Sequence, residues 1–187
     1  MSANQSFSPD TLGVNTPTPL VDAWTASVNF RKRPVNSRWA DFEWDTASVC
    51  VAADTPIERV GPTECVVDEE AQWHYEGERI ELHPSEGEGY WLNLNSPGPC
   101  IFVMWRLEEG DEVPRPAVVT VSYNEAGRML DAGDHVDNVP MPDDLKSALL
   151  AYTNAHYQPE PKKKVRRNDP FKDGAFRREP GAGAGRG

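Results

Sequence analysis

The chain has 187 residues, of which 38% are hydrophobic, and it contains 17 Pro and 14 Gly. This length supports one domain with a hydrophobic core, and so many helix-breaking residues exclude a helical bundle. Residues 161–187 hold nine Lys and Arg against three Asp and Glu, whereas residues 1–160 hold ten against 27. Because an acidic body repels polyanions, we expect no nucleic-acid binding by the folded part.

The two ends of the chain differ in composition from its centre. Residues 1–20 are rich in Ser, Thr, Asn and Pro, and residues 158–187 are rich in basic residues and Gly. Segments with so little apolar surface cannot offset their ordering entropy. The sequence therefore predicts two disordered tails around a single domain at 21–157.

The apolar pattern indicates no membrane segment. The longest apolar run is Ile101 to Trp105, and the N-terminus has no apolar stretch of the kind found in secretory signals. A spanning helix needs about 20 apolar residues. The sequence thus predicts a cytoplasmic protein that does not bind membranes.

The chain contains three cysteines, Cys50, Cys65 and Cys100. Their odd number and wide spacing give neither a complete disulfide framework nor a CxxC unit for metal or redox chemistry. We expect reduced thiols that are mostly buried.

In chain order, the first predicted element is a strand from Val21 that ends at residues 31–33. Its apolar residues alternate with polar ones, which is the period of a half-buried strand; they are Trp24, Ala26, Val28 and Phe30. A turn at 34–37 leads to a bent or bulged strand that returns beside the first. Residues 54–70 are acidic and broken by prolines, which predicts an exposed connection with a short strand at 65–67.

Residues 73–82 predict a compact hairpin with its turn at Glu76-Gly77-Glu78. The stretch 89–123 has the densest apolar content and predicts three central strands, at 89–95, 100–107 and 117–123. A Ser-Pro-Gly-Pro turn and an acidic loop separate them. We expect the core to lie here.

After residue 123 the apolar period changes to about 3.6, which is typical of helices. A short helix at 125–132 is predicted, with Asn124 as N-cap and Gly133 as its C-terminal stop. A second helix at 142–156 should lie against the sheet. Together these elements predict a β-rich α+β domain, with six or seven antiparallel strands in a sandwich or partly closed barrel and two C-terminal helices.

Four residues near the centre of the chain are candidates for a binding surface: Tyr90, Trp91, Trp105 and Arg106. The three rings could form a wall for a planar ligand such as a pterin or a nucleotide, with a cation-π contribution from the arginine. Alternatively, the aromatic side chains simply fill the two faces of a sheet, which is the commoner use of such residues.

Other chemical candidates are weaker. Asp131 to Asp137 collects three carboxylates and an imidazole, which suits either a divalent ion or a solvated acidic turn, and the lack of EF-hand spacing favours the turn. His74 and His83 could join a cysteine in a zinc site, but their spacing favours structural roles. The sequence has no GxSxG, GxxxxGK[ST], GxGxxG or HExxH motif, so we assign no catalytic residue, metal or cofactor. The absence of these motifs favours a non-enzymatic protein, and the alternative is an enzyme or ligand-binding protein with a pocket at the aromatic residues.

A basic run opens the C-terminal tail, with the cationic residues Lys162, Lys163, Lys164, Arg166 and Arg167. By composition it is typical of a nuclear localisation or nucleic-acid patch. A tail that binds an acidic partner, or the acidic body of its own chain, explains it equally well.

Several short motifs resemble one proteobacterial domain-of-unknown-function family. They are Arg33-Pro34, Arg38-Trp39, Trp44, Glu88-Gly89-Tyr90, Asn93-Leu94, Phe102 to Arg106, Val119 to Ala126, Leu130-Asp131, Val136-Asp137 and the Pro-Glu-Pro-Lys-Lys-Lys run before Arg166-Arg167. The resemblance covers about Val21 to Phe176, and so the whole predicted domain.

Genes of that family tend to lie in clusters for molybdenum-containing formate dehydrogenase. The resemblance therefore implies an accessory or assembly protein that contacts the dehydrogenase or its cofactor machinery. Some members are labelled molybdopterin-guanine dinucleotide biosynthesis proteins, but such a nucleotidyltransferase needs an N-terminal strand and a Gly-rich nucleotide loop, and this chain begins with a Ser/Pro-rich segment. The family supplies no catalytic residues to transfer to this sequence.

Overall fold

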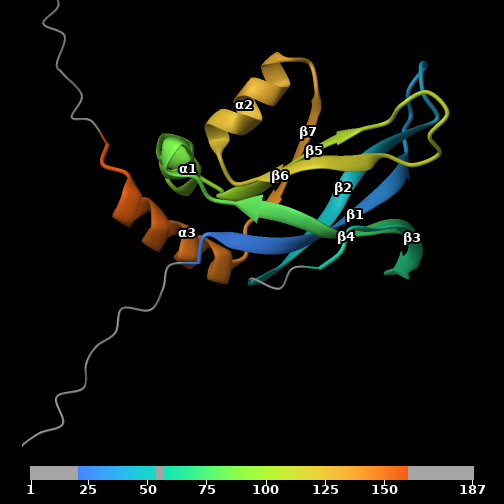
Figure 1. Cartoon of the computed structure of the whole chain (residues 1–187). Helices are drawn as coiled ribbons and strands as arrows, with labels where there is room; N and C mark the ends of the chain where they lie inside the picture. The colour runs from blue at the N-terminus through green and yellow to red at the C-terminus, as the bar shows by residue number, and fades with distance from the viewer. Residues whose placement is uncertain (1–20, 54–56, 160–187) are drawn as a thin grey trace, which may run out of the picture.

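The computed structural model describes residues 21–53 and 57–159 (Figure 1). Sheet A contains β1 (Ala23–Pro34), β2 (Phe42–Ala53), β3 (Val60–Val67) and β4 (Glu70–Glu81), in the order β2-β1-β4-β3. Sheet B contains β5 (Cys100–Arg106), β6 (Arg115–Thr120) and β7 (His135–Pro140), in the order β6-β5-β7. The helices are the short 3₁₀ helix η1 (Pro84–Glu86), α1 (Gly87–Leu94), α2 (Tyr123–Asp131) and α3 (Asp143–His156).

All paired strands are antiparallel, and the two sheets pack together as a sandwich. β4 lies beside β6 and β2 lies beside β7, so sheet B covers part of one face of sheet A. The mainly β sandwich is confirmed, while the described residues form no closed barrel. Helices α1 and α3 lie at one end, and the loops that join β1 to β2 and β5 to β6 extend at the other (Figure 1).

The side chains of β1 alternate between the core and the outer face, as their period of two predicts. Trp24, Val28 and Phe30 are buried, and the ring of Phe30 packs edge-on against Tyr75 of sheet A and Trp105 of sheet B. The core therefore includes β1 as well as the 89–123 stretch.

β2 returns beside β1 with the irregularity that the sequence predicts. The register of the pair shifts between Asn29 and Phe30. Residues 35–41 connect the two strands, and a 3.1 Å hydrogen bond from Val35 N to Asp41 O closes this connection. The short strand expected at 65–67 is longer, since β3 begins at Val60.

The predicted hairpin at 73–82 is wrong, because these residues belong to the single strand β4 and the turn that follows it. β4 pairs with β1 on one side and β3 on the other, which keeps it extended. Gly77, expected in a turn, has a φ of 81° and lies where the pairing with β1 shifts register. A Cβ there would lie 2.6 Å from the carbonyl oxygen of Glu58, so this bulge requires glycine.

The strand predicted at 89–95 is also wrong, because most of this segment is α1. Tyr90 and Asn93 are buried three residues apart on one helix face, whereas Trp91 is half-buried. A Cβ on Gly89 would overlap Ser122 Oγ, so the missing side chain lets α1 pack directly on the start of α2. The large side chains happen to alternate, and this imitates the period of a strand.

Two helices follow β6, as predicted, but β7 separates them. The N-cap of α2 is Ser122, whose Oγ accepts a 3.1 Å hydrogen bond from Glu125 N, rather than Asn124. Gly133, with a φ of 87°, follows the end of α2 as expected. The sequence does not predict β7, because Val136 and Val139 stand three positions apart and so lack the period of a strand; β7 is a strand because it pairs with β5.

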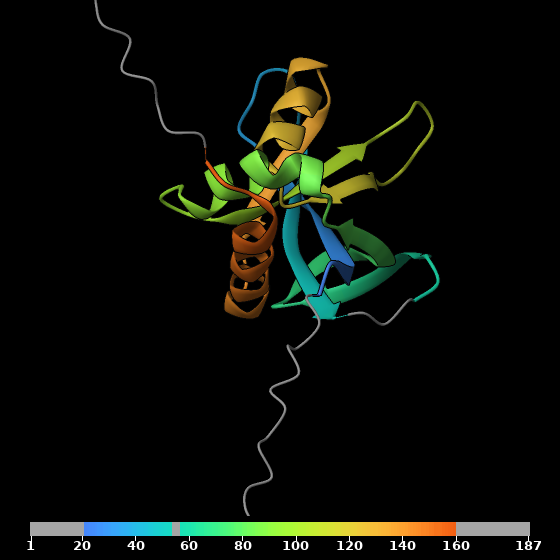
Figure 2. The ribbon, with the colours of Figure 1, turned by 60° about the vertical axis from the view of Figure 1, so that its left-hand side comes forward.

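α3 lies against the core through its apolar face, as predicted. Leu145, Leu149 and Tyr152 are buried, and the Tyr152 hydroxyl donates a 3.1 Å hydrogen bond to the Leu82 carbonyl oxygen. α1 lies between α2 and α3 (Figure 2). The three helices therefore form one continuous group at this end of the sandwich.

Asn93 fastens this helical group to sheet B. Its Nδ2 donates to the carbonyl oxygens of Cys100 at 2.7 Å and Val121 at 2.9 Å, and its Oδ1 accepts from Cys100 N at 3.1 Å. The side chain is fully buried. One amide thus satisfies backbone groups at the start of β5 and just after β6.

Replacing Asn93 with Ala leaves these buried backbone groups without a partner, so we expect the free energy of unfolding to fall by about 3 kcal/mol. Urea denaturation measures this value. Asn95→Ala is the matched control, because Asn95 is exposed and donates one bond, to the Trp91 carbonyl oxygen. We expect the control to change stability by less than about 0.5 kcal/mol, and equal losses would contradict the role of Asn93.

A second set of hydrogen bonds, to the carboxylate of Glu86, joins η1 to α2. Oε2 of Glu86 accepts from Ser122 Oγ at 2.6 Å, and Oε1 accepts from Arg128 at 2.8 Å. Burial by itself raises the pKa of Glu86, but the hydrogen bonds from Ser122 and Arg128 outweigh burial and hold the pKa below its ordinary value.

Because folding lowers the pKa of Glu86, its charged form stabilises the fold above the unfolded-state pKa, and this contribution is lost as the pH falls through the folded-state pKa. We expect Glu86→Gln to flatten the acid-induced loss of unfolding free energy between about pH 5 and pH 3. Urea unfolding at a series of pH values measures the slope. The exposed neighbour Glu88, changed to Gln, should keep the wild-type profile, and an unchanged slope in Glu86→Gln would contradict the linkage.

Candidate interaction surface

The β1–β2 hairpin extends past the region that sheet B covers. Phe30 is buried under sheet B, whereas Lys32 and Pro34, the next β1 residues on the same side, are exposed. Their cross-strand neighbours on β2 are Trp44 and Phe42. At this end, the face of sheet A that elsewhere packs against sheet B is therefore exposed to solvent.

Three aromatic rings and one cation make up this uncovered area, which we call the aromatic face: Lys32, Phe42, Trp44 and Trp73. The Trp44 and Trp73 rings lie 4.8 Å apart, and those of Phe42 and Trp44 lie 6.5 Å apart. Lys32 Nζ lies 3.4 Å from the centre of the Phe42 ring and 5.7 Å from that of Trp44. Phe42 is 42% exposed, so the face offers apolar surface and positive charge together.

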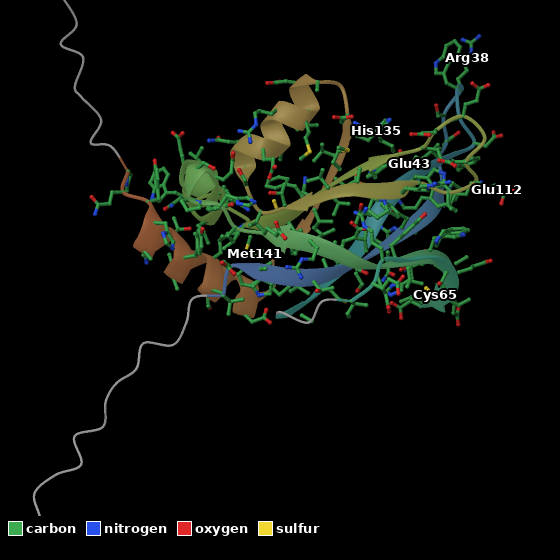
Figure 3. The ribbon with its side chains drawn as sticks, viewed as in Figure 1. Arg38, Glu43, Cys65, Glu112, His135 and Met141 are labelled. Carbon is green, nitrogen blue, oxygen red and sulfur yellow. The ribbon has the colours of Figure 1, made fainter. Side chains whose placement is uncertain are left out.

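The hairpin tip carries a second exposed aromatic residue, Trp39. It is 89% exposed, and the guanidinium carbon of Arg38 lies 5.7 Å from its ring. Figure 3 shows Arg38 at the far end of the hairpin, away from both sheets. Arg38 and Trp39 are among the residues that carry the family resemblance, but they are not among the binding residues predicted from the sequence. The available signal was that a tryptophan in a turn between strands has no core to enter.

Ion pairs across the hairpin hold its outer face. Arg31 makes two hydrogen bonds to Asp45, of 2.9 and 3.1 Å, and Arg33 contacts Glu43 at 2.8 Å and Asp45 at 2.9 Å. The hydrogen bond to Asp45 is the main reason that the pKa of Arg31 is raised. These pairs link the two strands beyond the end of sheet B.

The structure separates the candidate residues Tyr90, Trp91, Trp105 and Arg106. Tyr90 is 1% exposed, its ring packs against Tyr152, and its hydroxyl accepts a 2.9 Å hydrogen bond from His83 N. Burial raises the pKa of Tyr90 to about 12. Tyr90 thus belongs to the helical end.

Trp105 belongs instead to the junction of the two sheets. Its indole N–H donates to Asp137 Oδ2 at 2.9 Å, and its ring stacks on His135 with 4.6 Å between the ring centres. Arg106 is exposed and contacts Asp134 at 3.3 Å. The rings of Tyr90 and Trp105 therefore sit in different packing groups and do not line one wall.

The polar candidates have structural partners. His74 lies 2.6 Å from Asn29 Oδ1 and 3.1 Å from Glu76, and Asp137 accepts three hydrogen bonds instead of lying in a solvated turn. Within residues 21–53 and 57–159, no group of three or more His, Cys, Asp and Glu side chains is arranged to hold a metal ion.

All three cysteines are free thiols, but they are less buried than we expected. Cys50 is exposed, and Cys65 and Cys100 are half-buried. Burial raises the pKa of the Cys100 thiol. The tail residues from Lys162 to Arg167 lie outside the described part of the chain.

The cavity that Arg106 lines does not have the aromatic wall of a planar-ligand site. Its volume is about 200 Å³. The other lining residues are Glu108, Asp111, Arg115, Pro116 and Ala117. Small-molecule sites are usually larger and mainly apolar, so the uncovered aromatic face is the stronger candidate site.

Comparison with known proteins gives one match. The sequence model of DUF3305, described as a protein of unknown function, matches residues 25–166. The chain belongs to the DUF3305 family. The match takes in all seven strands except the first residues of β1, together with the three helices.

No curated protein and no solved structure matches the chain. In the described part of the chain, no helix combines the length and the apolar content needed to cross a membrane. The DUF3305 match therefore gives a family without an assigned activity, and the candidate surface has to be judged on its own geometry.

Changing Trp105 to Phe keeps most of the ring but removes the N–H that Asp137 accepts. We expect the free energy of unfolding to fall by about 2 kcal/mol, because a hydrogen bond to a charged group is lost in a buried site. Guanidinium denaturation followed by circular dichroism gives the value. Trp91→Phe, at a half-buried position of α1, should cost less, and the reverse order would contradict the anchoring role of Trp105.

Proposed function

We propose that this DUF3305 protein is a non-enzymatic accessory protein that binds a partner protein through the aromatic face and the hairpin tip. The observation that carries the proposal is Trp39, an 89% exposed tryptophan beside Arg38 at the end of a long hairpin. Tryptophan and arginine are the residue types most enriched among side chains that dominate binding energies.

The hairpin is suited to such a contact because its strands are already paired. Its ion pairs and the packed rings of Phe42, Trp44 and Trp73 reduce the number of side chains that must be ordered on binding. Association costs less free energy when the contact surface is preorganised. A tip of this kind can enter a groove or pocket of a partner.

The partner that we propose is a molybdenum-dependent formate dehydrogenase or its cofactor machinery, during maturation or assembly of the enzyme. This part of the proposal depends on the sequence resemblance described above. The basic tail from Lys162 to Arg167 supplies a second contact in this proposal, because its charge is opposite to that of an acidic partner surface.

Co-purification tests the proposal. Tagged full-length protein is expressed in a host that makes the dehydrogenase, alongside the double variant Arg38→Ala/Trp39→Ala and a truncation that lacks residues 161–187. Because both hairpin residues are exposed, we expect unchanged stability and a loss of at least about tenfold in dehydrogenase recovered, typical of a removed binding hot spot.

Leu150→Ala is the control, since Leu150 is a 50% exposed apolar residue on α3, at the other end of the molecule. It should recover as much dehydrogenase as the wild type. Full formate dehydrogenase activity in a strain that lacks this protein would contradict the maturation role. A melting temperature that rises with pterins or nucleotides would instead support the ligand-binding alternative.

A further inference from the structure

Among the described residues no strand pairs with the outer edge of β3, which is therefore the open edge of sheet A. β3 is the last strand in the order β2-β1-β4-β3, and seven of its eight residues are exposed. The opposite edge, at β2, is partly closed by sheet B, where Thr46 N donates to Asp137 at 2.7 Å. An uncovered edge strand presents unpaired backbone groups on which another strand can form.

The turn between β3 and β4 determines which backbone N–H and C=O groups of β3 bond to β4 and which point to the open edge. Only Asp68 and Glu69 lie between the paired residues Val67 and Glu70, and both have positive φ, 51° and 69°. This is a two-residue type I′ hairpin turn, in which the flanking residues exchange both backbone hydrogen bonds. Since hydrogen-bonded and non-hydrogen-bonded pairs alternate, Cys65 and Thr63 also bond to β4.

It follows that Glu64 and Val66 direct their N–H and C=O groups away from β4, to the free edge. The alternation can be followed across sheet A, because Glu64 is opposite Trp73 on β4, Trp73 is opposite Phe30 on β1, and Phe30 is opposite Thr46 on β2. It predicts that the N–H of Thr46 points outward from β2. Its hydrogen bond to Asp137 agrees with that prediction. The register therefore identifies Glu64 and Val66 as the two residues that can pair with an added strand.

The free edge lacks most of the features that usually block strand addition. The register shift between Val60 and Thr63 interrupts only its first half. Residues 63–67 contain no proline and a single charge, and Val66 is 73% exposed. Edge strands in stable monomers are commonly protected by lysine, proline or a covering element.

The charge around this edge indicates which kind of segment it accepts. Residues 57–81, which include β3 and β4, hold eight Asp and Glu and two Arg. A second copy would bring two such acidic hairpins together, whereas a basic segment is attracted. Glu64 is opposite Trp73 in the register, so an added strand would extend the sheet next to the aromatic face. Figure 3 shows Cys65 of β3 at the same end of the molecule as Arg38.

We propose that residues 63–67 of β3 bind an extended, basic segment of a partner protein as a fifth strand of sheet A. The inference deepens the proposed function, because it assumes a protein partner, but it does not depend on the hairpin tip. Backbone hydrogen bonds from Glu64 and Val66 supply affinity, and the acidic hairpin selects for Lys and Arg.

The test uses the full-length protein with three synthetic eight-residue probes: a peptide that alternates Lys and Val, its counterpart that alternates Glu and Val, and the Lys-Val peptide methylated at every backbone nitrogen, so that neither of its edges can donate a hydrogen bond. In the free protein, amide hydrogen exchange should be slow at Cys65 and fast at Glu64 and Val66. The Lys-Val peptide should slow exchange at Glu64 and Val66, and the other two peptides should not.

Val66→Pro removes an outward N–H without removing a bond to β4, so by fluorescence anisotropy it should bind the Lys-Val peptide about tenfold more weakly. Val66→Thr keeps the N–H and the branched shape and should bind as the wild type does. Slow exchange at Cys65 in both variants shows that the strand is still formed.

Equal affinity for the Lys-Val and Glu-Val peptides, or no protection by any probe, would overturn the inference. Protection of Glu64 and Val66 in the free protein would also overturn it, because a second copy or another part of this chain would then occupy the edge. If the Arg38/Trp39 variant loses the dehydrogenase but binds the Lys-Val peptide normally, the edge site stands independently of the hairpin contact.

Discussion

The arrangement of the two sheets depends on one carboxylate, that of Asp137. Its Oδ2 accepts hydrogen bonds from the backbone N and the hydroxyl of Thr46 on β2, at 2.7 and 3.0 Å, and from the indole of Trp105 on β5, at 2.9 Å. Three donors from two sheets satisfy one oxygen, which compensates for removing the charge from water. The bond also fixes the Trp105 ring over Phe30, and beyond this contact sheet A is no longer covered by sheet B.

The two ends of the sandwich therefore differ in how their polar side chains are used. At the helical end, polar groups are used inside the fold: Asn93 bonds to β5 and to the segment after β6, and Glu86 bonds to Ser122 and Arg128. At the hairpin end, the polar groups pair on the surface and aromatic rings are left partly exposed. A surface that is both ordered and apolar is costly in a free protein, and this favours a role in binding.

The sequence predicts the elements whose side chains alternate cleanly and fails where tertiary contacts decide the backbone. The apolar periods of β1 and α3 match their burial, and β5 is a continuous apolar run that is buried on both faces; the sequence predicts all three elements. Glu76-Gly77-Glu78 predicts a turn because glycine permits either a turn or a bulge, and only the pairing of β4 with β1 and β3 selects the bulge. The apolar residues of β7 lack the period of a strand, and its pairing with β5 makes it a strand.

The residues that carry the family resemblance also differ in whether contacts within the fold explain them. Tyr90 and Asn93 are buried and hydrogen-bonded, so their packing explains why those residue types stand there. Arg38 and Trp39 are exposed at the end of a turn that a smaller polar pair would close equally well. A large aromatic side chain in water gains nothing for folding, because burial is the source of its stabilising free energy. Among the described residues Trp39 remains 89% exposed beside Arg38, and for this reason our proposal of a partner contact rests on the hairpin tip rather than on the apolar centre of the sequence.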